Sequence, residues 1–139
     1  MSTGAIDPGA PMAHTRAAIA ARRVRAADVA QAALDRARAL ARLGAFLELF
    51  PDEALAQARQ VDERLAAGQP PRALEGVPVA IKDNMALAYG KTTCASRILE
   101  NYRSPFTGTA VQKLIDAGAI IIGKTNLDEF AMGSSGEHS

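Results

Sequence analysis

Two apolar runs that each end in a lysine decide the fold of this chain: Val79-Ala80-Ile81 leads into Lys82-Asp83-Asn84, and Ala119-Ile120-Ile121-Ile122 leads into Gly123-Lys124-Thr125-Asn126. Between them, residues 109–117 have helical spacing of their apolar side chains. A strand, a helical crossover and a second strand form a parallel βαβ unit. Ligands collect at the carboxyl ends of such strands, so we expect Lys82 and Lys124 at a functional edge of the sheet.

The region before this unit has the periodicity of helices. Residues 25–43 place four apolar side chains on one face, and residues 51–68 begin with proline, continue with a second apolar stripe and end at a glycine. The four residues of the first face are Val29, Ala33, Ala37 and Leu40. Those of the second stripe are Ala54, Ala58, Val61 and Leu65. Residues 45–50 are short and apolar enough to be a strand.

These patterns predict an α/β fold, with helices followed by the first βαβ unit of a mixed sheet that helices flank. Residues 1–14, rich in glycine, alanine and proline, are expected to be disordered. Residues 15–68 are expected to be mainly helical, and residues 74–139 to begin the catalytic core. A chain of 139 residues suits one domain.

Composition excludes several classes of function. A net charge of +1 gives no reason to expect avid binding of nucleic acid by this chain alone. Cys94 is the one cysteine, so neither an intrachain disulfide nor a cysteine zinc cluster can form, and His14 and His138 lack the spacing of metal ligands. We therefore predict no metal site. No secretion signal and no apolar run of about 20 residues are present, which indicates a cytoplasmic protein.

Residues 118–125 match the phosphate-loop pattern G-x-x-x-x-G-K-[ST] letter by letter. A phosphate loop needs an open cradle of backbone N–H groups between a strand and a helix. Here the variable positions are Ala-Ile-Ile-Ile, which suit a buried strand, and they follow a predicted helix. We therefore reject nucleotide binding at this place.

Lys82 permits two interpretations. A lysine that follows an apolar strand can simply emerge into water, paired with Asp83. Alternatively it is a desolvated base: an ordinary lysine has a pKa of about 10.4, burial lowers that value, and a neutral amine can take a proton from a serine hydroxyl. The local pattern leaves both interpretations open.

Other polar groups near the second strand are weaker candidates. Ser134 and Ser135, flanked by glycines, fit either a substrate-binding loop or an ordinary flexible one. Asn126 followed by Glu129 resembles the start of a capped helix, which would make Glu129 structural. Cys94 has no histidine nearby in sequence, so we interpret it as a packing residue.

Four runs of sequence resemble the amidase signature family, and together they cover about residues 74–135. They are Leu74–Asn84 (LEGVPVAIKDN), Lys91–Ser96 (KTTCAS), Leu99–Tyr102 (LENY) and Ala117–Ser135 (AGAIIIGKTNLDEFAMGSS). The resemblance implies the amidase-signature fold and a Ser–cis-Ser–Lys triad whose lysine falls on Lys82. It implies that both catalytic serines lie downstream of this sequence, so we expect an N-terminal fragment that is inactive alone. It places Ser134 and Ser135 near the substrate pocket, although Gly136 and His138 depart from the usual residues there.

The second and fourth runs are more particular to the family members that hydrolyse glutamine in tRNA-dependent amidotransferases. This resemblance implies that ammonia passes to a B subunit, where ATP and Mg²⁺ activate a mischarged Glu-tRNA(Gln) or Asp-tRNA(Asn), and that a small C subunit completes a heterotrimer. It implies no cofactor in this chain. Two alternatives stay open: a fragment of a free-standing amidase, and a truncated chain with only a binding or assembly role.

Overall fold

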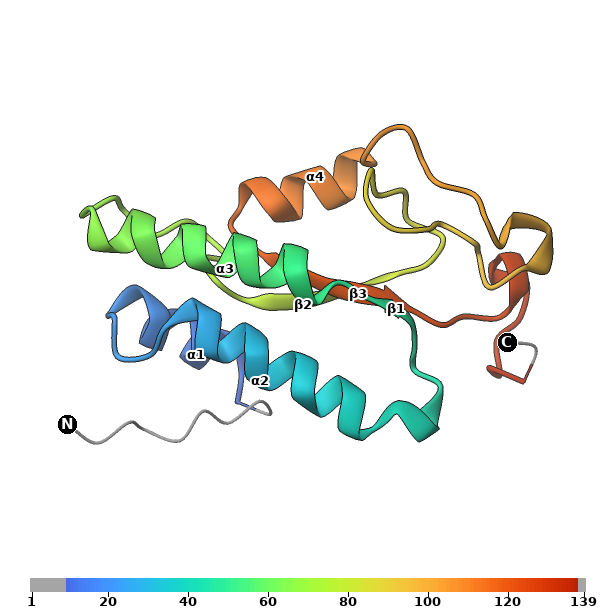
Figure 1. Ribbon diagram of the computed structural model, residues 1–139, viewed down its shortest axis with the longest axis horizontal. Coiled ribbons are helices and arrows are strands. Elements are labelled where there is room, and N and C mark those ends of the chain that lie inside the picture. Colours follow the sequence, from blue (N-terminus) through green and yellow to red (C-terminus); the bar gives the residue numbers. More distant parts are fainter. Residues whose placement is uncertain (1–9, 138–139) are drawn as a thin grey trace.

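A three-stranded mixed sheet forms the centre of the molecule in the computed structural model, which describes residues 10–137 (Figure 1). The strand order is β1-β3-β2. The central β3 (Ile120–Thr125) pairs antiparallel with β1 (Phe46–Leu49) and parallel with β2 (Pro78–Lys82). Helix α4 (Thr109–Asp116) lies on the connection from β2 to β3. The predicted βαβ unit and the α/β mixed sheet are therefore confirmed.

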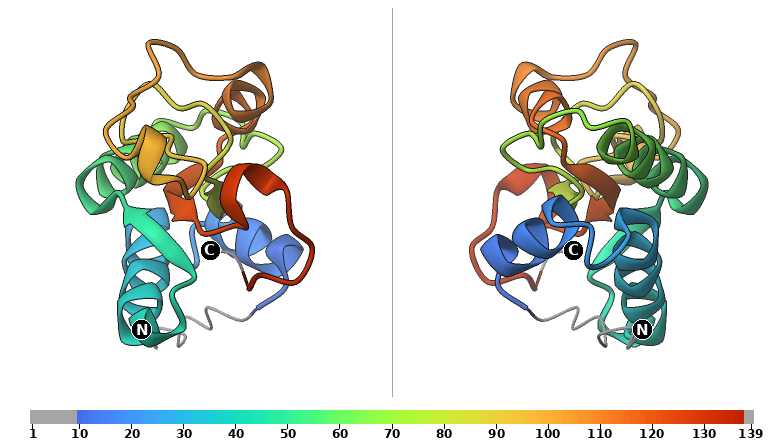
Figure 2. Two further views of the ribbon diagram at one scale, coloured as in Figure 1. Left: turned by 90° about the vertical axis from the view of Figure 1, so that its right-hand side faces the viewer. Right: turned by 90° about the vertical axis from the view of Figure 1, so that its left-hand side faces the viewer.

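The central strand is buried because helices cover both faces of the sheet. Ile120 and Ile122 pack in one apolar cluster with helices α2 (Ala26–Ala39) and α3 (Pro51–Ala66). Ile121, which points the other way, packs in a second cluster with Val111 of α4. The views in Figure 2 show α4 on one side of the sheet and α2 on the other.

The phosphate-loop pattern falls largely inside this strand. Residues Ile120–Thr125 are hydrogen-bonded into the sheet between β1 and β2, so their backbone N–H groups do not form an open loop. The letters of the pattern are all present, but their position in the central strand prevents them from forming a phosphate loop.

Helix α3 follows the sequence prediction closely. It begins at Pro51, and its four predicted stripe residues, Ala54, Ala58, Val61 and Leu65, are all buried. Ala54 and Ala58 have no exposed surface, which lets α3 approach its neighbours closely. Gly68 ends the helix with a φ of +75°, a conformation that glycine adopts without steric penalty.

Helix α2 departs from its prediction at the carboxyl end. It ends at Ala39, and the chain continues as a short 3₁₀ turn, η1 (Ala41–Leu43), up to Gly44. Leu40, predicted on the buried face, lies past the end of the helix and is 37% exposed. The buried face instead runs through Ala26, Val29, Ala30 and Leu34.

Helix α1 (Met12–Ala20) begins inside the segment that was predicted to be disordered. Its Ile19 is buried and approaches Gly76 so closely that a Cβ there would lie 2.9 Å from the Ile19 side chain. Residues 1–9 and His138 lie outside the described residues, so the predictions made for them are untested. Among residues 10–137, no helix is long and apolar enough to cross a membrane.

Candidate functional site

The two strand-end lysines lie at the same edge of the sheet, as predicted, but on opposite faces. In the parallel register Lys82 stands opposite Thr125, whereas Lys124 stands opposite Ile81. Partners in register project to the same face and successive residues to opposite faces, so the two lysines point apart. Lys124 therefore lies on the side of the buried Ile81, and Lys82 on the other side.

Lys124 is completely buried, and its ammonium group has a partner for each of its three hydrogens. Nζ lies 2.8 Å from Asp83 Oδ1, donates to Lys91 O at 2.9 Å and donates to Thr92 Oγ1 at 3.2 Å. The Asp83 side chain is only 2% exposed. A buried ammonium that lacked such partners would be strongly unfavourable, so these contacts explain how a lysine fits inside this protein.

Asp83 ties this ion pair to a loop through its other atoms. Its Oδ2 accepts hydrogen bonds from Thr93 N at 2.9 Å and Thr93 Oγ1 at 2.5 Å. Its backbone N–H donates to Thr125 O at 3.1 Å, and its carbonyl accepts from Cys94 N at 3.3 Å. The residue that follows Lys82 is thus fixed by both its side chain and its main chain.

Lys82 itself is exposed at the end of β2, and so is Ala80 on the same face of the strand. Among residues 10–137 its ammonium group has no hydrogen-bond or ion-pair partner. The interpretation that paired it with Asp83 is wrong, because Asp83 pairs with Lys124. Lys82 is therefore an exposed, unengaged amine at the end of β2.

The loop around residues 94–96 contacts the segment that follows β3. Ser96 Oγ donates to Glu129 Oε1 at 2.5 Å, and Phe130 N donates to Cys94 O at 3.0 Å. Two consecutive pairs meet here with positive φ angles, Cys94-Ala95 and Phe130-Ala131. Residues other than glycine rarely adopt this backbone conformation, which persists only where neighbouring contacts hold it.

The helix cap predicted at Asn126 and Glu129 is wrong. Only the 3₁₀ turn η3 (Glu129–Ala131) follows, and no side chain caps it. Asn126 Nδ2 instead donates to Gly44 O at 3.2 Å, just before the start of β1. Glu129 is structural, as expected, but through its bond to Ser96.

Cys94 is poorly suited to act as a nucleophile. Partial burial and the nearby Asp83 carboxylate raise the pKa of its thiol above the usual range, although the Lys124 ammonium acts in the opposite direction. The thiol therefore stays protonated near neutral pH and is less nucleophilic. These observations favour the packing role.

Ser134 and Ser135 are exposed, in a segment that Asp128 holds in place. Asp128 Oδ2 accepts from Gly136 N at 3.1 Å, and a Cβ at Gly133 would lie 2.5 Å from the same carboxyl group. In Figure 1 this carboxyl-terminal segment lies on the side of the molecule toward which β2 and β3 run. The contact of both serines with substrate stays a prediction.

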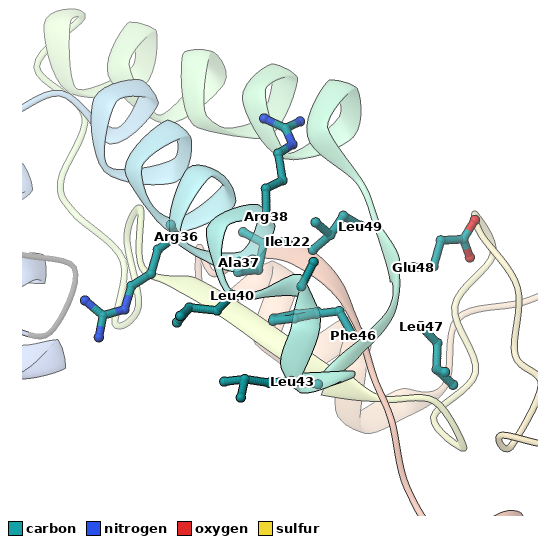
Figure 3. Close-up of a pocket in the computed structure, with 13 residues that line it drawn as sticks. Arg36, Ala37, Arg38, Leu40, Leu43, Phe46, Leu47, Glu48, Leu49 and Ile122 are labelled. Atoms are coloured by element: carbon teal, nitrogen blue, oxygen red, sulfur yellow. The ribbon is translucent and has the colours of Figure 1, made fainter.

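An apolar groove of about 550 Å³ lies elsewhere, between α2, η1 and β1 (Figure 3). Leu40, Leu43 and Phe46 line it, and Arg36 and Arg38 are its cationic members. Neither Lys82 nor Lys124 reaches it, and it holds no pair of groups suited to proton transfer. A smaller cavity of about 150 Å³ adjoins the buried ion pair and is lined by Leu47, Glu48, Asp83, Lys91 and Thr93.

The described residues offer no cluster of three or more histidine, cysteine, aspartate or glutamate side chains that could hold a metal ion. The sequence predicted the sheet edge at which both lysines lie, and the roles of Lys82, Ser134 and Ser135 stay predictions. It missed the buried role of Lys124 and Asp83. The one local sign was that Lys124 ends the most apolar strand of the chain, but that pattern indicates neither its burial nor its partner.

Comparisons with known proteins give a consistent result. The family model described as "Amidase" matches residues 28–139. The A subunit of glutamyl-tRNA(Gln) amidotransferase from Gloeobacter violaceus is 52% identical over 125 residues, which is 89% of this chain and 26% of the relative. Its counterpart from Carboxydothermus hydrogenoformans is 52% identical over 122 residues, covering 87% of this chain and 25% of the relative.

A solved structure, the peptide amidase of Stenotrophomonas maltophilia, superposes with a TM-score of 0.82 at 35% identity. The match covers 88% of this chain and 26% of that one. The chain thus spans about a quarter of the length of the curated relatives that it matches. The resemblance inferred from the four sequence runs is confirmed.

Proposed function

The chain belongs to the amidase family, and from that premise we propose that it is the amino-terminal part of the glutamine-hydrolysing subunit of a tRNA-dependent amidotransferase. Identity of 52% to two curated relatives that serve as A subunits, over nearly the whole chain, is the observation that supports this proposal most directly. The exposed Lys82 amine, at the carboxyl end of a parallel strand, is consistent with it.

In the proposed reaction a serine hydroxyl attacks the side-chain amide carbon of glutamine. The hydroxyl proton passes through a second serine to the amine of Lys82, and the departing nitrogen takes a proton back as it leaves as ammonia. Water then hydrolyses the resulting ester and releases glutamate. Both serines would come from polypeptide beyond residue 139, which would also cover the open face of β2 and desolvate Lys82.

The ammonia would serve a B subunit that binds ATP and Mg²⁺ and amidates mischarged Glu-tRNA(Gln) or Asp-tRNA(Asn), with a C subunit completing a heterotrimer in the cytoplasm. This division of labour requires no nucleotide site on the present chain, in line with the strand that occupies residues 120–125. Ser134 and Ser135 would contribute to the glutamine pocket.

The experiment is to produce the complete polypeptide that carries this chain and to identify the proteins that purify with it. Ammonia release from glutamine and conversion of Glu-tRNA(Gln) and Asp-tRNA(Asn) are then measured with and without ATP. We expect partner-dependent, ATP-dependent amidation. A monomer that is fully active on simple amides, with no effect of tRNA, would overturn the proposal.

A free-standing amidase is the second candidate, and the likeness to a peptide amidase favours it. It would share Lys82 and differ in partners and substrate, so the same assay separates the two. A role limited to binding or assembly would leave both the assay with glutamine and the assay with simple amides without turnover.

A further inference from the structure

The buried pair formed by Lys124 and Asp83 has no step of its own in the proposed reaction, yet it lies one residue from Lys82. We propose that this ion pair is a positioning device that fixes the direction in which the Lys82 amine leaves the sheet. The inference rests on the proposed function and assigns a role to two residues that take no part in the proposed proton transfer.

The hydrogen-bond network around the ion pair permits one arrangement only. Lys124 has three ammonium hydrogens and three acceptors within 3.2 Å, and both carboxylate oxygens of Asp83 are engaged. No described polar group of the pair is left to exchange partners. A buried network that is fully satisfied holds its members in a single geometry, because any rotation would leave a charge unpaired.

A buried ion pair contributes less to stability than the attraction between its charges suggests. Buried ion pairs add little net stability compared with apolar residues of similar volume, because desolvation offsets the attraction. The side chains here are 0% and 2% exposed, so the offset applies in full. Specific geometry, rather than stability, is then the property that this pair supplies.

Asp83 follows Lys82 directly in the chain, so its position affects that of the reacting amine. The backbone N–H of Asp83 donates a hydrogen bond to Thr125 O of β3, and its carbonyl accepts one from Cys94 N. Met85 N donates to Lys82 O at 2.9 Å, which closes a turn directly after the lysine. The Cys94 carbonyl in turn accepts from Phe130, so the same network reaches the segment that leads to Ser134 and Ser135. A shift of Asp83 would therefore move Lys82 relative to the proposed pocket.

The test replaces the pair by apolar residues of similar size, Asp83→Leu with Lys124→Met, in the complete enzyme with its partners. Because both charges are removed together, no unpaired charge is left in the interior. The matched control is Asp35→Leu with Arg38→Met, which removes an exposed ion pair of the same kind from α2.

We expect kcat for glutamine hydrolysis to fall at least about tenfold in the buried-pair variant, with KM and the melting temperature near those of the control. Backbone amides of Asp83, Thr93 and Cys94 should exchange hydrogen at least about tenfold faster, while amides of α3 stay unchanged. A kcat within about twofold of the control would overturn the proposal.

If the double variant does not fold, Thr92→Val decides the matter, because it removes one acceptor of the Lys124 ammonium and keeps the shape of the side chain. A kcat at least about threefold lower with unchanged KM supports the positioning role, and an unchanged kcat overturns it. An enzyme without amidase activity before substitution would refute the proposed function instead. Hydrogen exchange at Asp83 would then decide the positioning claim alone, since faster exchange supports it and unchanged exchange contradicts it.

Discussion

Two lysines with the same local pattern have opposite environments in this fold. Both follow an apolar strand, yet Lys124 is fully buried and Lys82 is exposed. The difference arises from sheet register, because residues that are one position apart face opposite sides. Register depends on the pairing of segments that are about 40 residues apart, which a local pattern does not contain.

This contrast predicts a large difference between two single substitutions. Lys124→Met leaves the Asp83 carboxylate buried without its cation, so we expect the free energy of unfolding to fall by about 3–5 kcal/mol. Lys82→Met removes an exposed amine and should change it by less than about 0.5 kcal/mol. Urea unfolding of both variants measures the difference, and equal effects would contradict the assignment of environments.

Glu75 predicts how stability depends on pH. Burial alone would raise the pKa of its carboxyl group, but hydrogen bonds from Arg72 and the charges of Arg72 and Arg64 hold it below the usual range. A carboxyl whose pKa is lower in the folded state stabilises the fold above its unfolded pKa of about 4.3. The contribution disappears as pH falls through the lower folded value.

We therefore expect Glu75→Gln to reduce the free energy of unfolding by about 1–3 kcal/mol at pH 7. The gap between variant and unsubstituted protein should begin to narrow as the pH falls below about 4.3, where the unfolded chain takes up the proton, and should close as the pH falls through the lower pKa of the folded state. Urea unfolding at several pH values between about 7 and 3 measures the gap. A gap that does not narrow in acid would mean that the ion pairs of Glu75 are not its source.

At the scale of elements, a side chain of α3 caps the amino-terminal end of α2. Asp62 of α3 accepts hydrogen bonds from Ala26 N at 2.7 Å and Ala27 N at 3.2 Å, at the start of α2. Arg25, the residue in the capping position, supplies no capping hydrogen bond, and its Nε lies 3.7 Å from Asp62 Oδ2. The amino-terminal N–H groups of α2 are thus satisfied from the neighbouring helix.

Removing this contact should weaken the packing of α2 on α3. We expect Asp62→Ala to lower the free energy of unfolding by about 0.5–2 kcal/mol, the usual range for a lost amino-terminal cap. Glu63→Ala, one residue further along and exposed, is the control and should have little effect. Thermal unfolding of the two variants provides the comparison, and a loss equal to that of the control would show that the cap is not important.

The elements could largely be predicted, whereas their mutual contacts could not. Proline at the start of α3 and glycine after its end are local signals, and both have the expected roles. The end of α2 was missed because Leu40 continues the apolar period although the helix stops before it. Asp62, Lys124 and Asp83 act on partners more than 30 residues away, so periodicity carries no trace of their roles.

At the scale of the whole molecule, the small sheet leaves two strand edges unpaired among the described residues. The chain spans about a quarter of its curated relatives, and β1 and β2 pair only with β3 among the described residues. The groove beside β1 exposes Leu43 and Leu47 by 60% and 45%. Unpaired strand edges beside exposed apolar side chains favour association between copies.

We therefore expect the 139-residue chain alone to self-associate at micromolar concentration. Leu43→Gln with Leu47→Gln should reduce light scattering, whereas Met132→Gln, an exposed apolar residue outside the groove, should not. A monodisperse chain before substitution would contradict the interpretation of the groove as a face that needs a cover.

The central claim is that this chain supplies the lysine of a glutamine-hydrolysing site, and the most direct measurement is ammonia release from glutamine by the complete enzyme carrying Lys82→Ala. Lys113→Ala, on the exposed side of α4, is the matched control. We predict a loss of at least about a thousandfold in kcat/KM for Lys82→Ala, with partners still bound, and an unchanged value for Lys113→Ala. Activity of the Lys82→Ala enzyme within about tenfold of the control would contradict the account.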